Sequence, residues 1–427
     1  MNTREIILKT LYDVEINGAY FNRALSAAIA KCSEIDRRFL TELVYGVTKN
    51  KLMLDYIISR FASVKIKKMS PWVHLILQMG TFQMYYMDKI PPSAACNESV
   101  KLAKKYAHSA SVRFVNGVLR SIAKNIDNIP LPDKTDTITY LSTLYSYPLW
   151  MSEKLVKEYG AENAEHIMRE SNRSHPVTLR VNTLKTTREQ LLALLKSEGA
   201  HAKPCELFEN FITVCGKLNI TALKSYKDGL FSLQNLSSYR AAAALSPKSG
   251  SYVMDICAAP GGKSCAMAEL MNNKGEILSF DIHAHKTKLI DASALRLGIN
   301  IIKSSQHDGT QFMREYEEKA DYVMLDAPCS GLGVIHKKPD IKWTRSENDI
   351  TELAKLQSAL LDTASKYLKI GGVLLYSTCT LLKEENENIT NSFLRLNKGF
   401  EKLSEITIFP SENGESGFYI CKLKRIA

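Results

Sequence analysis

The sequence from residue 236 to the end alternates short apolar strands with helices, and this alternation restricts the fold more than any other feature. Five apolar runs between helical patterns are predicted strands: SYVMDI, EILSFD, INIIKSS, DYVMLD and GGVLLYS. Strands that alternate with helices form a parallel, doubly wound sheet. Such a sheet binds its ligands at the carboxyl ends of its strands. The residues just after each strand are therefore the candidates for chemistry.

The chain before residue 236 follows a different pattern. Residues 1 to about 126 carry apolar side chains at helical spacing, which predicts a compact bundle of about five to seven helices. Residues 127–148 hold three prolines and are interpreted as a linker with a short helix. A small mixed α/β stretch follows. We expect domains at 1–130, 131–235 and 236–427.

The charge of the chain favours a polyanionic partner. The net charge is +11 and the isoelectric point is about 9.0, and nucleic acid is the commonest partner of such a protein. Residues 101–125 contain six Lys or Arg and no Asp or Glu, and residues 56–87 contain four and again no acid. A basic face on a helical bundle suits phosphate contacts. An ordinary solvated surface is the alternative.

Cysteine usage and the first residues indicate a cytoplasmic protein. The nine cysteines include no C-x-x-C pair, so the spacing of a zinc site is absent. His283 and His285 have no third ligand at useful spacing, so we expect no metal. The sequence shows neither the apolar core of a signal peptide near residue 1 nor an 18-residue apolar run. Unpaired thiols persist in a reducing cytosol.

The first predicted strand ends in Asp255 and is followed by CAAPGGK at 257–263. Gly261 and Gly262 let backbone N–H groups approach a ligand closely, and the next helix would direct its positive N-terminus at that ligand. The loop does not match a Walker A motif, because Cys257 stands where the first glycine of that motif is required. The dinucleotide pattern G-x-G-x-x-G is absent as well. A merely tight turn remains the alternative.

Two further strands end near acids. Asp281 follows the second strand and could accept both hydroxyls of a ribose. Asp308 follows the third strand and could accept an adenine amino group, although a helix N-cap is the alternative. A glycine loop with two strand-end acids and no phosphate motif fits S-adenosylmethionine, which combines adenine, ribose and an amino acid without a pyrophosphate.

The fourth and fifth strands are each followed by a cysteine. Cys329 comes shortly after Asp326, and Cys379 follows YST. A thiolate that adds to C6 of a pyrimidine makes C5 nucleophilic enough to attack an electrophilic methyl group. Two thiols at neighbouring strand ends could both reach one base beside the cofactor. Simple packing of buried cysteines is the alternative.

Three stretches resemble motifs of the RNA cytosine-C5 methyltransferases: CAAPGGK, LDAPCSGLG with KKPDIKW, and YSTCTLLKEENE. The helical region resembles the NusB-like RNA-binding domain, and the combination is similar to the bacterial enzymes that methylate 16S ribosomal RNA. The resemblance covers nearly the whole chain. It implies an all-α NusB-like N-terminal bundle, a small α/β middle segment and a C-terminal Rossmann-like methyltransferase domain that uses S-adenosylmethionine.

The resemblance also implies roles for individual residues. Cys379 is the nucleophile, and Cys329 assists release of the methylated product. Asp326 lies between cofactor and base and hydrogen-bonds the cytosine edge. The ribose acid falls on Asp281 and the adenine-side acid on Asp308. The rest of the cofactor site is one loop: Cys257, Ala258, Ala259, Pro260, Gly261, Gly262 and Lys263. Two positions depart from the family pattern, Thr380 in place of serine and Lys338 in place of arginine, and Lys338 cannot make a bidentate phosphate contact.

The implied activity is methylation of C5 of one cytosine in 16S rRNA, the cytosine that the family numbers 967, through a Cys–C6 adduct. The implied partner is 16S rRNA or a partially assembled small ribosomal subunit, and we expect a monomer that binds no membrane. Another RNA such as tRNA is an alternative substrate. A non-catalytic NusB-like assembly factor and, more remotely, a P-loop NTPase are the alternatives of another class.

Overall fold

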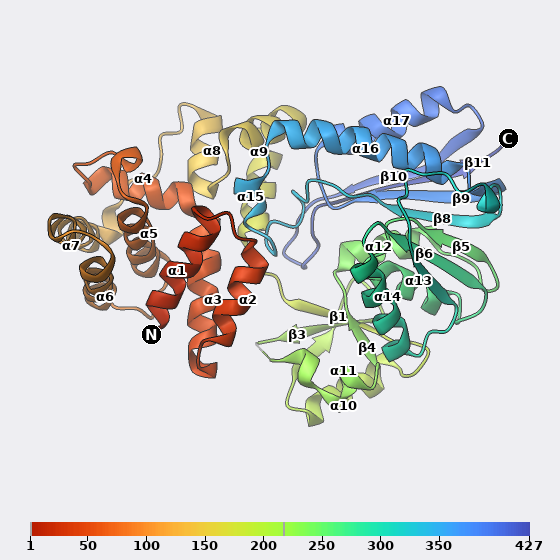
Figure 1. Ribbon diagram of the computed structural model, residues 1–427, viewed down its shortest axis with the longest axis horizontal. Helices are drawn as coiled ribbons and strands as arrows, with labels where there is room; N and C mark the ends of the chain where they lie inside the picture. Colours follow the sequence, from red (N-terminus) through yellow and green to blue (C-terminus); the bar gives the residue numbers. More distant parts are fainter. Residues whose placement is uncertain (1, 217) are drawn as a thin grey trace. The chain divides into compact units, whose positions relative to one another are not determined.

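The computed structural model describes residues 2–216 and 218–427, which form two compact units (Figure 1). One unit comprises Met1–Asn172 and Lys338–Thr344, and the other comprises Arg173–Lys337 and Arg345–Ala427. The first unit is helical, and both sheets lie in the second. None of the described helices has the length and apolar character needed to span a bilayer.

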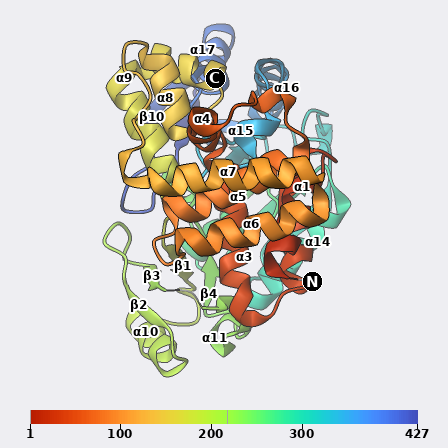
Figure 2. The ribbon, with the colours of Figure 1, turned by 90° about the vertical axis from the view of Figure 1, so that its left-hand side faces the viewer.

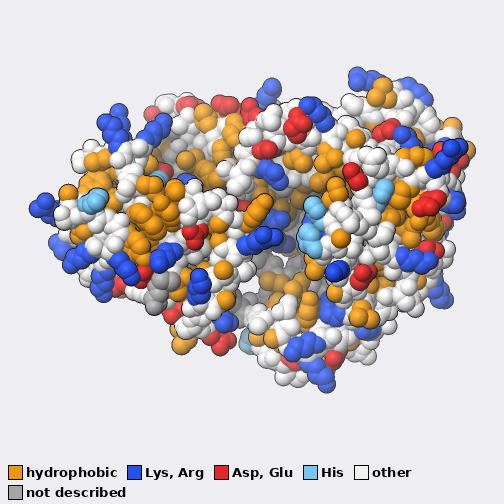
Figure 3. Space-filling model, viewed as in Figure 1, with side chains coloured by type: hydrophobic (Ala, Val, Ile, Leu, Met, Phe, Trp, Pro, Cys, Tyr) orange, Lys and Arg blue, Asp and Glu red, His pale blue; other side chains and the backbone are white. Residues whose placement is uncertain are grey.

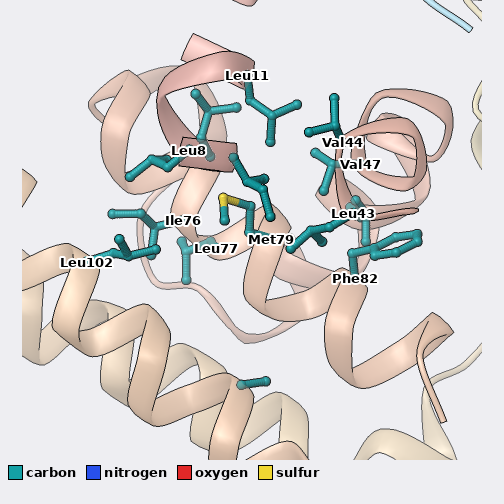
Figure 4. Packing of buried hydrophobic residues seen from close by; sticks show 14 of the residues in the cluster. Leu8, Leu11, Leu43, Val44, Val47, Ile76, Leu77, Met79, Phe82 and Leu102 are labelled. Atoms are coloured by element: carbon teal, nitrogen blue, oxygen red, sulfur yellow. The ribbon is translucent and has the colours of Figure 1, made fainter. Parts of the chain in front are cut away.

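The first unit is the helical bundle that the apolar spacing predicts. Its first helices are, in chain order, α1 (Thr3–Glu15), α2 (Phe21–Ala30), α3 (Glu34–Lys49), α4 (Lys51–Phe61), α5 (Pro71–Tyr86), α6 (Pro92–Tyr106) and α7 (Ser109–Lys124). Helices α5, α6 and α7 lie side by side (Figure 2). Figure 4 shows leucine, valine and isoleucine side chains of α1, α3, α5 and α6 packed together in the core of this bundle.

Helix α5 is buried on most of its surface and needs close neighbours. The side chain of Ser70 caps it by accepting from the N–H of Val73, and Pro71 occupies its first position. Helix α3 contributes Gly46, where an added Cβ would lie 1.9 Å from Cζ of Phe82. Glycine therefore allows α3 to approach the Phe82 ring, and this approach offsets the weak helix propensity of glycine.

The chain between the bundle and the sheets is more helical than the sequence indicates. The linker at 127–148 contains the one predicted helix, α8 (Thr137–Tyr145). The long helix α9 (Leu149–Asn172) follows and is bent at Gly160, where φ is +79°. The sequence does not predict this helix, because charged residues interrupt its apolar residues at most turns.

A segment distant in sequence completes the helical unit. Residues Lys338–Thr344 contain the short helix α15 (Ile341–Thr344), and they pack with the first 172 residues. The Lys342 side chain is fully buried, and Trp343 donates from Nε1 to the carbonyl oxygen of Thr48 at 2.7 Å. Lys342 Nζ lies 4.1 Å from the ring centre of Tyr147, and burial lowers its pKa well below the usual value. Nζ donates to three oxygens, at distances of 3.2, 3.0 and 2.8 Å: Lys49 O, Tyr145 O and Asn172 Oδ1.

The second unit begins with a small antiparallel sheet in the order β2-β3-β1-β4. The strands are β1 (Val177–Val181), β2 (His201–Pro204), β3 (Phe211–Cys215) and β4 (Phe231–Leu233), with helices α10 (Arg188–Ser197) and α11 (Lys224–Lys227). Strands β1 and β3 and helix α10 are confirmed predictions. Strand β2 is short and mostly exposed, and β4 has only three residues, so neither carries an apolar pattern of its own.

The large sheet has the order β10-β11-β9-β8-β5-β6-β7. Strands β9, β8, β5, β6 and β7 pair in parallel, as predicted. Strand β11 adds antiparallel to β9, and β10 adds antiparallel to β11. The strands are β5 (Tyr252–Asp255), β6 (Glu276–Asp281), β7 (Ile302–Gln306), β8 (Ala320–Asp326), β9 (Leu368–Thr378), β10 (Phe400–Ile408) and β11 (Phe418–Arg425).

Helices cover both faces of this sheet, and a separate apolar core lies under each layer (Figure 1). One layer contains α12 (Leu236–Leu245), α13 (Gly262–Leu270) and α14 (Ala284–Leu297), and the other contains α16 (Glu347–Ser365) and α17 (Glu387–Leu396). The predicted fold class, a Rossmann-like domain after a helical bundle and a small α/β segment, is therefore confirmed.

Candidate active site

The parallel strands bring the predicted site residues to one edge of the large sheet. Strand β8 lies between β5 and β9, with Asp255 opposite Met324 and Asp326 opposite Ser377 in register. The carboxyl ends of β5, β8 and β9 are consequently neighbours. The loops that carry the glycines, Asp326 and the two cysteines therefore start side by side.

The loop after β5 turns sharply into α13. Gly261 has a φ of +96°, which favours glycine, and its N–H donates to the carbonyl oxygen of Ala258 at 2.8 Å. The peptide between Ala259 and Pro260 is cis. At Gly262 an added Cβ would meet only Gln234, at an ordinary 3.7 Å. The packing of the described residues therefore leaves space at Gly262 for a ligand to approach the backbone.

Asp255 is fully buried behind this loop, and the sequence assigned it no role. Ser264 Oγ donates to its Oδ2 at 2.7 Å. Oδ1 is buried and has no hydrogen-bond partner among the described residues. Burial raises the pKa of Asp255 to about 7. Burial also raises the pKa of Cys257 far above its usual value, so this thiol stays protonated at neutral pH.

Asp281 lies at the end of β6 and is nearly buried. Its Oδ1 accepts from the N–H of His283 at 3.0 Å, and Lys286 Nζ lies 3.8 Å away. His283 and His285 are exposed where α14 begins. The carboxylate is thus held by the start of α14 and retains a free direction for a ligand's hydroxyl groups.

Asp308 caps a turn rather than a helix. Its Oδ1 accepts from the N–H of Thr310 at 3.0 Å and from Thr310 Oγ1 at 2.8 Å. These hydrogen bonds hold the pKa of Asp308 below its usual value. The next described helical turn begins only at Arg314. The acid is ionised and half-buried, and its second oxygen, Oδ2, is not used in this turn.

Asp326 is held from both sides at the end of β8. Lys263 Nζ donates to Oδ2 at 2.6 Å, and Ser377 Oγ donates to Oδ1 at 2.7 Å. Lys263 therefore connects the glycine loop to Asp326, and Ser377 connects Asp326 to the strand that carries Cys379. Each carboxylate oxygen has a fixed orientation.

The two strand-end thiols are adjacent. Sγ of Cys329 and Sγ of Cys379 lie 3.2 Å apart, and the N–H of Cys379 points to Sγ of Cys329 at 3.3 Å. Both residues are partly exposed. The hydrogen bond to Cys379, followed by burial and the nearby charges of Glu385 and Asp326, raises the pKa of Cys329 well above its usual value. Two thiols this close do not both ionise, so Cys329 is the protonated partner.

A buried carboxylate that the sequence did not single out holds the cysteine loops in place. Glu385 Oε2 accepts from the N–H of Ser330 at 2.8 Å and from Gln357 Nε2 at 2.9 Å, and Oε1 accepts from Ser330 Oγ. Ser330 Oγ also lies 2.8 Å from Thr380 Oγ1. The residue after Cys329 is thus tied to the residue after the second cysteine. Thr380 supplies the hydroxyl group that a serine would supply there.

The chain after Cys329 also returns to Cys379. The N–H of Gly333 donates to the carbonyl oxygen of Cys379 at 2.9 Å. Burial lowers the pKa of Lys337, and its interaction with Cys379 acts in the opposite direction. Lys337 and His336 line a cavity of about 280 Å³ together with residues 174–178 and 233–235. The loop that carries Cys329 therefore also carries Lys337 and lines this cavity.

The fold and this edge of the sheet are those of a Rossmann-like methyltransferase. A crystal structure of NSun6 from Pyrococcus horikoshii with SFG aligns with a TM-score of 0.58 and 25% identity, covering 64% of this chain and 97% of that one. Residues 242–424 match the family model described as 16S rRNA methyltransferase RsmB/F, residues 1–124 match the NusB family, and residues 147–221 match the ferredoxin-like domain of RsmF/B-like methyltransferases.

Two relatives match over the full length. The "Probable ribosomal RNA small subunit methyltransferase B" of Bacillus subtilis is 39% identical over 99% of both chains. The protein of the same name from Synechocystis is 33% identical over 100% of both. The chain therefore belongs to the RsmB/F family of 16S rRNA methyltransferases, and the resemblance inferred from its motifs is confirmed.

Proposed function

We propose that this enzyme uses S-adenosylmethionine to methylate C5 of one cytosine in 16S rRNA, the cytosine that the family numbers 967. The pair of thiols at adjacent strand ends, 3.2 Å apart and beside Asp326, is the observation that carries this proposal. The names of the relatives supply the substrate class. We further propose a cytoplasmic monomer in which 1–130 and 131–235 bind RNA and 236–427 perform catalysis.

The residues around the glycine loop fit the cofactor. S-adenosylmethionine, when bound, supplies an electrophilic methyl group. Its amino group is cationic and suits the buried, unpaired Oδ1 of Asp255. Asp281 would accept from the ribose hydroxyls, and Asp308 would accept from the adenine amino group. The absence of phosphate-binding motifs agrees with a ligand of this kind.

Cys379 would act as the nucleophile. Its thiolate adds to C6 of the cytosine, and the electron density moved to C5 makes that carbon reactive toward the methyl group. The neighbouring cation of Lys337 favours the thiolate over the thiol. Asp326, oriented by Lys263 and Ser377, would hydrogen-bond the cytosine edge. The base must leave its stack to reach this site, as in other enzymes that react with bases.

Cys329 would assist release. After methyl transfer, C5 would lose its proton to water, the electron pair left at C5 would form the C5–C6 double bond, and the C6–S bond would break, so that Cys379 leaves as a thiolate. The S–H of Cys329 would assist by donating a hydrogen bond to this leaving sulfur, 3.2 Å away. The raised pKa of Cys329 keeps it protonated and prevents it from competing as a nucleophile. The short distance between the two sulfur atoms supports this proposed role.

The roles of the two cysteines are separable by substitution. Cys329→Ala should accumulate a covalent protein–RNA adduct that survives denaturing electrophoresis. Cys379→Ala should abolish both the adduct and methyl transfer. If Cys379→Ala turns over normally, the assignment is wrong.

Methylation assays can distinguish the candidate RNA substrates. Transfer of a radioactive methyl group to naked 16S rRNA, to small ribosomal subunits and to tRNA should favour one of the two ribosomal forms. Bisulfite sequencing of 16S rRNA should show one cytosine that is protected from conversion in the wild type and is converted in a strain lacking the protein. Methylation of tRNA alone would replace the proposed substrate, and failure to bind S-adenosylmethionine in calorimetry would favour a non-catalytic factor.

A further inference from the structure

A groove of about 460 Å³ lies in the helical unit, far in sequence from the thiols. Its lining comes from two stretches, the end of the α4–α5 connection with the start of α5, and the end of α6 with the start of α7. The lining residues that matter below are Val64, Lys68, Trp72, Tyr106, His108 and Phe114. No acidic side chain of the described residues lines this groove.

Aromatic rings from both sides line the groove, and two of them, Trp72 and Tyr106, are held by stacking. The rings of Tyr12 and Trp72 stack at 3.8 Å between centres with an angle of 7°, and Trp72 stacks on Tyr106 at 4.8 Å with an angle of 28°. Trp72, Tyr106 and Phe114 are each partly exposed. Ordered, partly exposed rings give a flat apolar surface that loses little conformational freedom when another ring stacks on it.

The two chain segments that line the groove carry basic side chains and no acidic ones. Its two sides belong to the acid-free segments 56–87 and 101–125, which together carry ten Lys or Arg, four in the first and six in the second. The nearest acid on the aromatic side, Glu5, is neutralised by Lys105 at 2.6 Å and accepts from the hydroxyl of Tyr106. On this unit Figure 3 shows hydrophobic side chains gathered over α1 and α5, with Lys and Arg around them.

We propose that this groove binds unpaired nucleotides of the RNA substrate, with a base stacked on its exposed rings and the neighbouring phosphates on Lys68 and the other basic residues of the two lining segments. This inference rests on the proposed function, because it assumes an RNA substrate. Stacking on aromatic rings within a basic groove is how proteins bind single strands without reading their sequence. A base-paired helix would not present its base faces to the rings.

The occupant follows from the charge. An apolar protein helix would bind to the aromatic rings and would not require basic residues around them. A nucleic acid uses both, because its bases stack on rings and its phosphates contact basic side chains. The groove would therefore hold a single-stranded part of the substrate while another nucleotide reacts in the second unit. Its contribution should appear in RNA affinity and not in cofactor binding.

The full-length protein can be tested with a short single-stranded RNA that contains 4-thiouridine. After irradiation, mass spectrometry should find cross-links on peptides that carry Trp72, Tyr106 or Phe114, and a duplex of the same sequence should give few. Cross-links only elsewhere in the chain would overturn the proposal. The same holds if this groove cross-links to a ribosomal protein in small-subunit particles but never to RNA.

Substitutions give a second readout. Phe114→Leu keeps an apolar side chain but removes the stacking face, and it should weaken binding of this RNA about 5- to 100-fold. Lys68→Glu should also weaken binding and flatten its salt dependence. Lys89→Glu is the matched control, because Lys89 is an exposed lysine beyond the far end of α5, about 24 Å along the helix from the groove.

Further measurements on these variants distinguish a failure of the groove proposal from a failure of the proposed catalytic function. Calorimetry with S-adenosylmethionine should give the wild-type affinity in all three variants, which shows that the methyltransferase domain is intact. If Phe114→Leu and Lys68→Glu methylate 16S rRNA with the wild-type KM, the groove proposal fails and the catalytic proposal stands. If the groove cross-links to RNA but no methyl group is transferred, the reverse is true.

Discussion

Replacing Glu385 tests whether one buried carboxylate positions the two thiols. The side chain accepts hydrogen bonds from the N–H and hydroxyl of Ser330 and from Gln357 Nε2. Glu385→Ala leaves the Ser330 N–H without an acceptor and removes one of the two acceptors of the Gln357 amide, which keeps its hydrogen bond to Pro328 O. Each buried N–H group that loses its acceptor costs about 1–3 kcal/mol, so the loss for the two groups should be about 2–6 kcal/mol. For a unit of this size the melting temperature should fall by roughly 10 °C.

Glu385→Gln separates charge from shape. The glutamine oxygen can still accept from the Ser330 N–H and from Gln357, and the Ser330 hydroxyl can rotate to donate to Thr380, so the loss should be about 1–2 kcal/mol. The negative charge of Glu385 is one cause of the raised pKa of Cys329. Its removal should lower that pKa, and alkylation of Cys329 by iodoacetamide should then begin at lower pH.

Differential scanning calorimetry and the pH profile of alkylation check these two effects. Glu384→Gln is the matched control, because it makes the same charge change one residue away and leaves the hydrogen bonds to Ser330 in place. The positioning role is refuted if Glu385→Ala melts within about a degree of the wild type. It is also refuted if Glu385→Gln leaves the alkylation profile of Cys329 unchanged.

Three further predictions concern stability. Burial lowers the pKa of Lys49 to about 8 from 10.5. The unfolded chain binds this proton more tightly than the folded protein does, so the free energy of unfolding should rise between about pH 8 and 10.5. Lys49→Met should flatten that rise in thermal melts. Burial raises the pKa of Asp255 to about 7 from 3.8. The folded protein binds this proton more tightly than the unfolded chain does, so the free energy of unfolding should fall by about 3 kcal/mol as pH rises from about 4 to 7. Asp255→Asn should remove this fall in urea titrations without ligand. Gly46→Ala should cost about 1–3 kcal/mol, because its Cβ would collide with the Phe82 ring; Gly117→Ala, with no atom within 4 Å, should be neutral or slightly stabilising, and equal melting temperatures for the two variants would contradict the packing argument.

The strand ends were predictable because their signals are local. A run such as DYVMLD is apolar for several residues and ends in an acid, and the parallel topology then brings it beside its neighbours. The sequence pattern therefore predicts that Asp326, Cys329 and Cys379 lie near one another at the strand ends. Strand β10 shows the limit, because its residues are mostly exposed and carry no apolar run.

The support around the thiols could not be read from the sequence. Ser330 and Glu385 are 55 residues apart, and no periodicity links them. Lys342 lies in a stretch that resembles a catalytic motif, yet its ammonium group is buried among oxygens of the helical unit. Contacts of this kind form between segments that are distant in sequence, and a local sequence pattern does not predict them.

The most direct test of the central claim uses an RNA substrate with 5-fluorocytidine at the target position. Fluorine at C5 blocks the loss of a proton that lets the enzyme leave, so the reaction should stop with the RNA attached to the protein. Mass spectrometry of the digested complex should then find the nucleotide on the peptide that contains Cys379. Attachment to Cys329 instead, or ordinary methylation of cytidine without any attachment to the fluorinated RNA, would contradict the account.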